Sequence, residues 1–448
     1  MKEGFAYTVD LARRLEFPDL RDVPLHRYED LLNATPFVFR VHDELAHVKH
    51  TLSNDFIARE YVGESSRSIV DNRLNRELPL NFDAFKVQYA IKAHIRNFFK
   101  VQNPYTNCPW ISTTPLWTWA IGEAIKRSST LKDVRVTVID LRKLLEFDRS
   151  LPGNASERRM VFYGMELLHL TNQTHDAYAS EWTNHPQEIL VYGVIPASTI
   201  VNTISFGSLG VPVAFAPESG PVPESPLPPW YFRGFTNKDV VIWKYSRTAK
   251  WYSGFEGARA SLLRNFKCWA ETKHDGDASG LMDEIASTAF RFAEFLVLRK
   301  GQFREAIESA RKEARGWEMD AEDDLVERLR RTKLRDRAPS VDGLSASSEV
   351  GDSDEFPREQ ILKNVRELWE RVMGMTWIIA IWGLEDLDDT HWDILQAQIM
   401  HHARDYALEK DSLELEVKRC EVTYNHHSSQ QKTLWLTTSS LRPKIVVW

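Results

Sequence analysis

The sequence has few cysteines, no basic excess and no long apolar run, and each absence argues against a class of protein. Three widely spaced cysteines among 448 residues give neither a disulfide framework nor a zinc motif. The formal net charge of −7 makes nucleic-acid binding unlikely, because such binding favours a basic domain. The longest late apolar run, residues 375–384, is about half of what a bilayer span requires. The sequence therefore predicts no membrane segment.

The N-terminal stretch MKEGFAYTVDLARRLEF lacks the continuous apolar core of a secretory signal. We expect a soluble intracellular protein, cytoplasmic or nuclear. The sequence also contains no HExxH, Walker, GxGxxG or GxSxG motif, so it predicts none of the enzyme classes that these motifs mark. A hydrophobic fraction of 43% and 15 tryptophans supply a large core, and the length favours two compact units.

Composition changes along the chain and predicts five segments. The proline-rich GPVPESPLPPW at 220–230 is typical of a linker or long loop, and the acidic, serine-rich stretch 339–357 is typical of disorder. The predicted segments are an N-terminal arm (1–35), an α+β domain (36–255), a helical region (256–338), a disordered acidic linker (339–357) and a C-terminal helical region with a short strand-like tail (358–448).

Within the α+β domain, β-branched and aromatic runs predict strands, and apolar spacing near 3.6 predicts helices. The predicted strands are TPFVFRV at 35–41, a strand end at ISTTP, VRVTVIDL at 134–141, EILVYGVI at 188–195 and, as an edge strand, DVVIWKYS at 239–246. The predicted helices cover 79–101, with an apolar face of Phe85, Tyr89, Ile91 and Ile95, and 161–170.

The C-terminal part contains two apolar stripes at helical spacing. One consists of Ile285, Ala289, Phe292 and Leu296, and the other of Ile361, Val365, Leu368, Val372 and Met375. Interspersed charges over 299–337 indicate a solvated helical face. Because the stripes exceed what one short helix buries alone, we expect this helical region to mediate assembly or to bind a protein partner.

The most informative polar residue is Glu188, at the start of an apolar strand that ends at Ile195-Pro196. A carboxylate in such a place costs stability unless it has a partner or a role. Arg40 and Ser112, in two earlier segments, are residue types that could supply a cation and a hydroxyl beside it. Breaking a glycosidic bond needs such a set, because a carboxylate stabilises the positive charge that develops on the sugar.

Each of these residues also has a structural interpretation. Arg40 is close in sequence to Asp43 and Glu44 and could form a structural ion pair. Ser112 to Thr114 could cap the helix that follows, and Glu188 could face solvent. The sequence leaves these alternatives open.

A metal site is a further alternative. Glu44 with His47, and Glu166 with His169, have the Glu-x-x-His spacing of di-metal carboxylate sites. Such sites need a Glu from each of two further helices, and Glu44 directly follows a strand. We therefore expect no metal, and chance spacing explains the two pairs better.

Residues 36–202 resemble a domain of unknown function common in filamentous-fungal proteins. The resemblance rests on the Phe-Arg-Val strand with an acidic residue after it, the Ser/Thr-rich segment before an aromatic-rich helix, and the ending Tyr-Gly-Val-Ile-Pro. That family implies no activity.

The same segments resemble, in order, the mono-ADP-ribosyltransferases of the cholera and pertussis toxin class. The matching pieces are FRVHD, ISTTP and QEILVYGVIP. This resemblance implies an ADP-ribosyltransferase-like fold, with NAD as substrate and a protein as acceptor. It implies that Arg40 holds the NAD phosphate or ribose and that Ser112 orients the catalytic carboxylate. Glu188 would bond the ribose 2′-hydroxyl and stabilise the cation.

The remaining residues of this implied NAD site are Thr114, His42 and Trp117. Thr114 stands where the toxins have their second serine, and His42 stands where they often have aspartate. Trp117 is one of three neighbouring tryptophans that could stack on the nicotinamide or adenine ring.

One departure from the toxin pattern bears on the reaction. The toxins usually carry Gln or Glu two positions before the catalytic Glu, where it engages the acceptor. Here that position is Pro186, and Gln187 would point to the opposite face of the strand. The sequence therefore favours NAD hydrolysis over transfer to arginine, and the alternative is a catalytically silent interaction domain.

Overall fold

The structure is a computed structural model that describes residues 20–44, 49–50, 55–97, 108–128, 133–151, 159–205, 228, 230, 251–335, 356–381 and 389–440. The predicted strand at 239–246 and nearly all of the predicted linkers at 220–230 and 339–357 lie outside these residues. The chain divides into two compact units. Unit 1 comprises residues 1–298 and 371–402, and unit 2 comprises residues 299–370 and 403–448.

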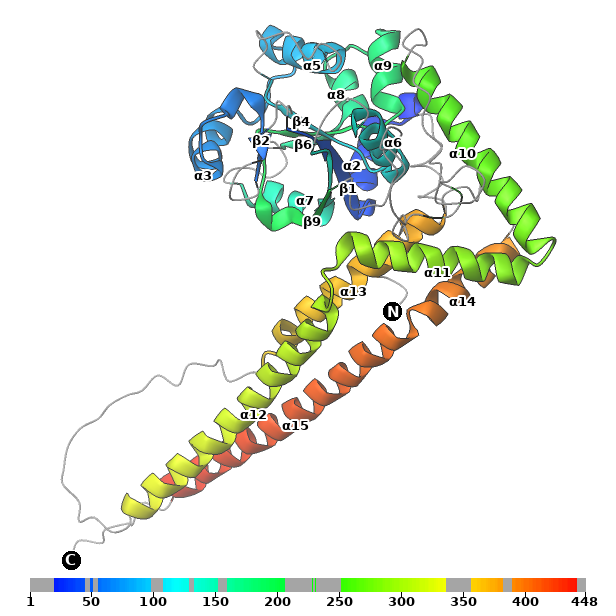
Figure 1. Cartoon of the computed structure of the whole chain (residues 1–448). Coiled ribbons are helices and arrows are strands. Elements are labelled where there is room, and N and C mark those ends of the chain that lie inside the picture. Colours follow the sequence, from blue (N-terminus) through cyan, green and yellow to red (C-terminus); the bar gives the residue numbers. More distant parts are fainter. Residues whose placement is uncertain are drawn as a thin grey trace, which may run out of the picture. The chain divides into compact units, whose positions relative to one another are not determined.

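Short strands and helices alternate in unit 1, and long helices follow them (Figure 1). The strands are β1 (Phe37–His42), β2 (Lys49–His50), β3 (Phe56–Ile57), β4 (Trp110–Thr113), β5 (Arg135–Asp140), β6 (Val161–Tyr163), β7 (Ile189–Tyr192), β8 (Val194–Ile195) and β9 (Ile200–Ser205). The α-helices are α2 (Leu25–Ala34), α3 (Ser66–Ser68), α4 (Asn75–Glu77), α5 (Phe85–Asn97), α6 (Trp117–Ser128), α7 (Leu141–Ser150), α8 (Gly164–Leu170), α9 (Ala177–Asn184), α10 (Trp251–His274), α11 (Ala278–Val297), α12 (Gln302–Arg335), α13 (Arg358–Ala380), α14 (Asp389–His402) and α15 (Arg404–Ser440). Single turns are η1 (Leu20–Asp22), η2 (Arg59–Tyr61), the π-helical η3 (Ile69–Leu74) and η4 (Ala197–Thr199).

The described strands form three antiparallel sheets, in the orders β1-β5-β9, β2-β3-β8 and β4-β7-β6. Phe39 of β1 exchanges two backbone hydrogen bonds with Thr114, just after β4, with N···O distances of 2.7 and 3.0 Å. This bridge brings the first sheet to the third. As a result, the ends of β1, β4 and β7 lie close together although they are far apart in the sequence.

The strand β7 shows why these runs fold as they do. It is the central strand of its sheet, between β4 and β6, and all four of its residues are buried. A strand covered on both faces is apolar throughout and does not alternate. The continuous run Ile-Leu-Val-Tyr has this pattern, and a polar residue at its start is correspondingly exceptional.

The predicted strand at 188–195 is divided in two by Gly193. This glycine has φ +82°, a conformation that side chains with a Cβ rarely adopt. Because of the break, β7 pairs with β4 and β6, whereas β8 pairs with β3 of another sheet. One apolar run therefore contributes to two sheets.

Only part of the predicted apolar face of helix α5 is buried. Ile91 and Ile95 are buried, but Phe85 is 80% exposed and Tyr89 is 55% exposed. The two exposed rings stack on each other, with centroids 6.0 Å apart. The buried side of the helix instead includes His94, whose side chain is 11% exposed.

Segments from far along the chain complete unit 1. The predicted stripe on α11 is buried, and Phe292 from this stripe packs on Trp117 of α6 with ring centroids 5.1 Å apart. The last part of α13 places Gly374 against Phe37 of β1, and its Arg371 lies 3.5 Å from Asp140 at the end of β5.

Unit 2 contains α12, α15 and most of α13. Phe303 packs on Tyr406 and Trp317 on Tyr424, so α12 and α15 run side by side in the same direction (Figure 1). The helix α13 runs the opposite way, because its earlier residue Arg358 pairs with Glu421, whereas Arg366 pairs with the earlier Glu414 of α15. That this region binds a protein partner stays a prediction.

The predicted class, α+β with a mainly helical C-terminal region, is confirmed. None of the described helices combines the length and apolar character that a bilayer crossing needs.

Candidate functional site

The three predicted catalytic residues come from strands that the fold brings together. Ser112 is on β4, paired with Leu190 of β7, and Glu188 is the residue before β7 begins. Arg40 on β1 is adjacent to the residue that bridges to Thr114. Arg40, Ser112 and Glu188 therefore approach one place from three segments.

A histidine joins the members of this cluster. His94 Nε2 lies 2.8 Å from Ser112 Oγ and 3.5 Å from Glu188 Oε1. Arg40 Nη1 donates a hydrogen bond of 2.6 Å to the carbonyl oxygen of Ser112. The predicted cation, hydroxyl and carboxylate thus lie in one cluster. His94, which was not predicted, contacts both the hydroxyl and the carboxylate.

The second nitrogen of the same imidazole contacts a thiol. His94 Nδ1 lies 2.9 Å from Sγ of the half-buried Cys108, two residues before β4. Burial alone would lower the pKa of His94, but Cys108 and Glu188 outweigh burial and raise this pKa to about 10. The imidazole is therefore held in its charged form at neutral pH.

The cluster keeps unsatisfied polar atoms away from solvent. Arg40 is 8% exposed and Glu188 is 4% exposed. Burial, and secondarily Arg127, lower the pKa of Arg40 to about 9, so its guanidinium stays charged at neutral pH. Among the described residues, neither Arg40 Nε nor Glu188 Oε2 has a hydrogen-bond partner. Burying such groups unpaired costs free energy.

The backbone of Glu188 is held on both sides. Its carbonyl oxygen accepts a hydrogen bond of 2.7 Å from Gly164 N, and its N–H donates to Thr183 O at 3.1 Å. A Cβ on Gly164 would clash with the Thr183 side chain and approach the Glu188 carbonyl to 3.2 Å. The glycine thus allows the close approach that fixes the carboxylate.

Asp43, one of the ion-pair partners suggested for Arg40, is bound by another arginine. Arg127 of α6 lies 2.9 Å from a carboxylate oxygen of Asp43 and 2.9 Å from one of Glu123. Both carboxylate side chains are buried. Asp43 therefore has a close cationic partner other than Arg40.

The other predicted cofactor-binding residues make contacts within the fold. Thr114 Oγ1 donates to Pro186 O at 2.5 Å and accepts from Leu116 N at 3.1 Å, which ties β4 to the start of α6. His42 Nε2 lies 3.0 Å from Thr137 Oγ1 on the neighbouring strand. Trp117 is 1% exposed and packs on α11.

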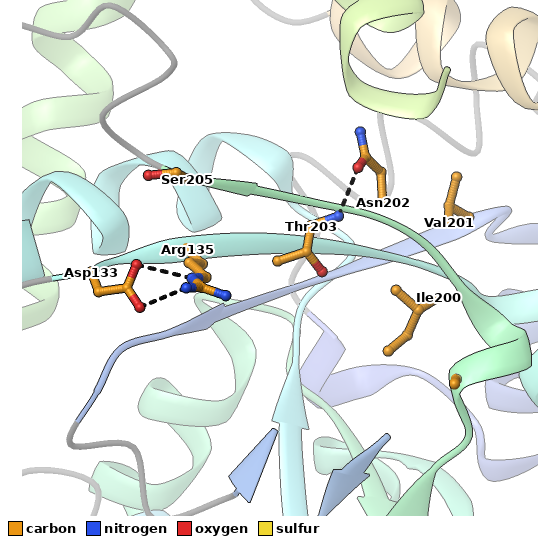
Figure 2. A pocket seen from close by; sticks show the side chains of 8 residues that line it. Asp133, Arg135, Ile200, Val201, Asn202, Thr203 and Ser205 are labelled. Atoms are coloured by element: carbon orange, nitrogen blue, oxygen red, sulfur yellow. Dashed lines mark hydrogen bonds and ion pairs between the residues drawn. The ribbon is translucent and has the colours of Figure 1, made fainter. Parts of the chain in front are cut away.

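A groove of about 450 Å³ lies on β9, apart from this cluster (Figure 2). Its lining includes Arg135, which is held by Asp133, and the side chains of Asn202 and Thr203. Thr203 Oγ1 lies 2.9 Å from Thr137 Oγ1, the same hydroxyl that His42 contacts. The groove holds none of the predicted site residues.

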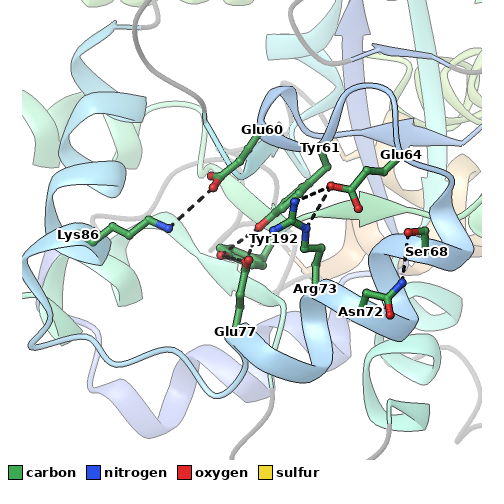
Figure 3. A network of polar contacts seen from close by, with 9 residues as sticks. All are labelled: Glu60, Tyr61, Glu64, Ser68, Asn72, Arg73, Glu77, Lys86 and Tyr192. Carbon is green, nitrogen blue, oxygen red and sulfur yellow. Dashed lines mark hydrogen bonds and ion pairs between the residues drawn. The ribbon is translucent and has the colours of Figure 1, made fainter.

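A second buried polar network surrounds Tyr192 at the end of β7 (Figure 3). The hydroxyls of Tyr61 and Tyr192 both donate to Glu77 Oε2, at 2.5 and 2.7 Å. Burial raises the pKa of both tyrosines, so both hydroxyls stay protonated. Each hydroxyl has an acceptor, and the network is therefore explained as structural.

Sequence reasoning missed His94 and Cys108. A cysteine with a histidine elsewhere in the chain is a recognised signal for a thiol site, but only the fold shows that the two meet. Among the residues that the structure describes, no group of three or more His, Cys, Asp or Glu side chains is arranged to hold a metal ion. Glu166 of the second Glu-x-x-His pair instead binds Arg159, at 2.8 and 3.0 Å.

Comparison with known families gives one match. Residues 33–209 match the family model of a domain of unknown function, DUF7587. The match covers less than half of the chain and includes every residue of the cluster described above. No curated protein and no solved structure matches the chain.

Proposed function

We propose that the domain containing residues 33–209 is ADP-ribosyltransferase-like, binds NAD and cleaves its nicotinamide–ribose bond. The observation that carries the proposal is the meeting of Arg40, Ser112 and Glu188, which belong to three separate segments.

The carboxylate of Glu188 has the properties that this reaction needs. When the C1′–N bond breaks, nicotinamide leaves with the bonding electrons and positive charge develops on the ribose. A buried carboxylate stabilises that charge strongly, because little water screens it. Glu188 Oε2 has no hydrogen-bond partner among the described residues, so it can accept a hydrogen bond from the ribose without losing one that it already makes.

Arg40 and Ser112 supply the supporting roles. The buried guanidinium of Arg40 is a fixed positive charge suited to a phosphate or a ribose oxygen. Ser112 is linked to Glu188 through His94, so its hydroxyl helps to orient the carboxylate. These assignments are expected from the resemblance and are supported by the contacts.

Water is the acceptor that this geometry favours. Pro186 occupies the position two residues before Glu188 and has no side-chain donor or acceptor. Its carbonyl oxygen accepts the Thr114 hydroxyl. The next residue, Gln187, is 2% exposed and has φ +49°, so its amide is directed by the fold and is not presented to an acceptor. We therefore propose hydrolysis in place of transfer to arginine.

The experiment follows nicotinamide release from NAD with the full chain. Glu188→Gln keeps the shape of the side chain and removes its charge, and we expect it to lower the rate by about 100-fold or more. Glu166→Gln is the matched control, because Glu166 is equally buried at 4% but lies in the ion pair with Arg159. Its rate should remain near that of the natural sequence.

Two results would overturn this proposal. One is the absence of nicotinamide release together with an unchanged melting temperature in NAD, which is the outcome expected of a catalytically silent interaction domain. The other is a release rate that Glu188→Gln leaves unaltered.

A further inference from the structure

The proposed NAD reaction makes no use of Cys108, although this thiol belongs to the same cluster. Three unlike groups form a chain of contacts from Cys108 Sγ through the two nitrogens of His94 to Glu188 Oε1. Thiol, imidazole and carboxylate in that order are the parts of an activated nucleophile, in which a base contacts the nucleophile and a third group orients the base.

The fold fixes each member of this chain independently. The carbonyl oxygen of Cys108 accepts a hydrogen bond from Glu60 N at 3.2 Å, and Gly193 N donates to Pro109 O at 2.8 Å. These bonds anchor the segment that leads into β4. Glu188 is held by the backbone bonds to Gly164 and Thr183, so the thiol and the carboxylate approach His94 from two anchored strands.

The two nitrogens of the His94 imidazole face different groups. Nδ1 faces the thiol, and Nε2 faces both Ser112 Oγ and Glu188 Oε1. An acceptor on the Nε2 side retains a proton there and leaves Nδ1 to exchange its proton with sulfur. The imidazole of His94 and the buried guanidinium of Arg40 both interact electrostatically with Cys108.

We propose that Cys108 is a catalytic nucleophile, with His94 as its base and Glu188 as the residue that positions the imidazole, in a site that accepts acyl esters or thioesters. The proton of the thiol is held on His94 Nδ1 as an ion pair, and the sulfur anion attacks the carbonyl carbon to form a C–S bond. The bond from that carbon to the leaving oxygen or sulfur then breaks, and His94 returns the proton to the leaving group. Water hydrolyses the resulting thioester, which releases the acid and restores the thiol.

The first test uses the full chain, without NAD, and iodoacetamide as the probe. The other two cysteines are internal references, because Cys268 is exposed and Cys420 is buried with a pKa raised by burial. At about pH 6, where an ordinary thiol is mostly protonated, we expect Cys108 to be alkylated at least about tenfold faster than Cys268. Peptide mass spectrometry measures each site separately.

Variants distinguish a Cys108 thiol that His94 activates from one that is only exposed to the reagent. His94→Asn should remove the advantage of Cys108 at low pH, and Glu188→Gln should shift the pH profile of its alkylation. Cys268→Ser should alter neither. Alkylation of Cys108 no faster than that of Cys268, or only in urea, would overturn the proposal, as would a pH profile that neither variant changes.

The second test uses p-nitrophenyl acetate as the acyl probe. We expect a burst of p-nitrophenol close to one equivalent of protein, with an acetyl group found on Cys108, and no burst from Cys108→Ser. A burst that survives in that variant contradicts the assignment. Neither test contains NAD, so failure here leaves the nicotinamide-release result standing, and failure of nicotinamide release leaves the thiol result standing.

Discussion

Two sets of charged side chains, one in each unit of this protein, differ in burial. In unit 1, charged side chains are buried in clusters, such as Arg127 between Asp43 and Glu123. In unit 2, charged pairs lie at the borders between helices, where Glu416 of α15 accepts hydrogen bonds from Arg311 and Arg315 of α12 at 2.7–3.1 Å. Buried charge is costly to leave unpaired, whereas surface pairs contribute little. The comparison indicates that removing one partner of a charged pair costs more stability at the buried pairs of unit 1 than at the helix borders of unit 2.

The largest expected effect comes from removing a cation that lies between two buried carboxylates. Arg127→Met leaves two buried carboxylates without this partner, and we expect a loss of about 3–5 kcal/mol in the free energy of unfolding of unit 1. Hydrogen exchange in β1 and α6 measures it locally. Arg366→Met is the matched change in unit 2, where Arg366 is 34% exposed, and should cost below about 1 kcal/mol. Equal losses would contradict the comparison.

The next effect depends on pH. Asp148 of α7 is 5% exposed, and burial raises its pKa from 3.8 to about 6, despite the hydrogen bond that it accepts from Met160 N. A carboxyl whose pKa is raised in the folded state binds more protons there than in the unfolded chain. Unit 1 should therefore lose stability as pH rises through this window, by on the order of 3 kcal/mol.

Asp148→Asn tests this dependence, because it keeps an acceptor for Met160 N and removes the charge. The variant should be more stable than the natural sequence above about pH 6, and the difference should vanish near pH 4. Urea unfolding at a series of pH values measures it. A difference that does not vary with pH would show that the carboxyl titrates normally.

Glycine substitutions should have opposite signs in the two units. Gly193→Ala places a Cβ at φ +82° and 3.1 Å from Leu74 Cδ2, and should cost about 1–2 kcal/mol. Gly316 of α12 has nothing within 4 Å of an added Cβ, so Gly316→Ala should stabilise its helix by up to about 1 kcal/mol. Thermal unfolding of the two variants measures both. Two shifts of the same sign would be inconsistent with these backbone conformations.

The smallest expected effect on stability comes from the ion pairs between α12 and α15. Glu416→Gln should lower stability by below about 1 kcal/mol, and high salt should abolish the difference, because exposed pairs are screened. Urea unfolding at low and high salt measures it. A loss that persists at high salt would show that this pair behaves like the buried ones.

Strands with a strong local pattern could be predicted from the sequence. The runs that form β1, β5 and β7 are rich in β-branched or aromatic residues, and the stripes on α11 and α13 are buried as expected. Patterns of this kind reflect burial within a single element, so they can be recognised without any knowledge of its neighbours.

What could not be predicted depends on contacts between distant segments. The apolar spacing of α5 indicated a face that includes Phe85, whereas the buried side contains His94. Its partners are Ser112 on β4 and Glu188 just before β7, both further along the chain. The break at Gly193 could not be predicted for the same reason, because only the pairing of β8 with β3 shows that the run forms two strands. The cluster of Arg40, Ser112 and Glu188 was proposed from resemblance, and spacing alone could not have connected them.

The division of unit 1 between two stretches of sequence has a consequence for its synthesis. The ribosome completes residues 1–298 and then makes 299–370 before the remaining stretch, 371–402, emerges. Until then, Phe37 has no contact with Gly374, and Asp140 has none with Arg371. While more than seventy further residues are synthesised, Phe37 and Asp140 lack these partners, and this part of unit 1 stays exposed. A partly folded chain with exposed apolar surface is prone to misfold.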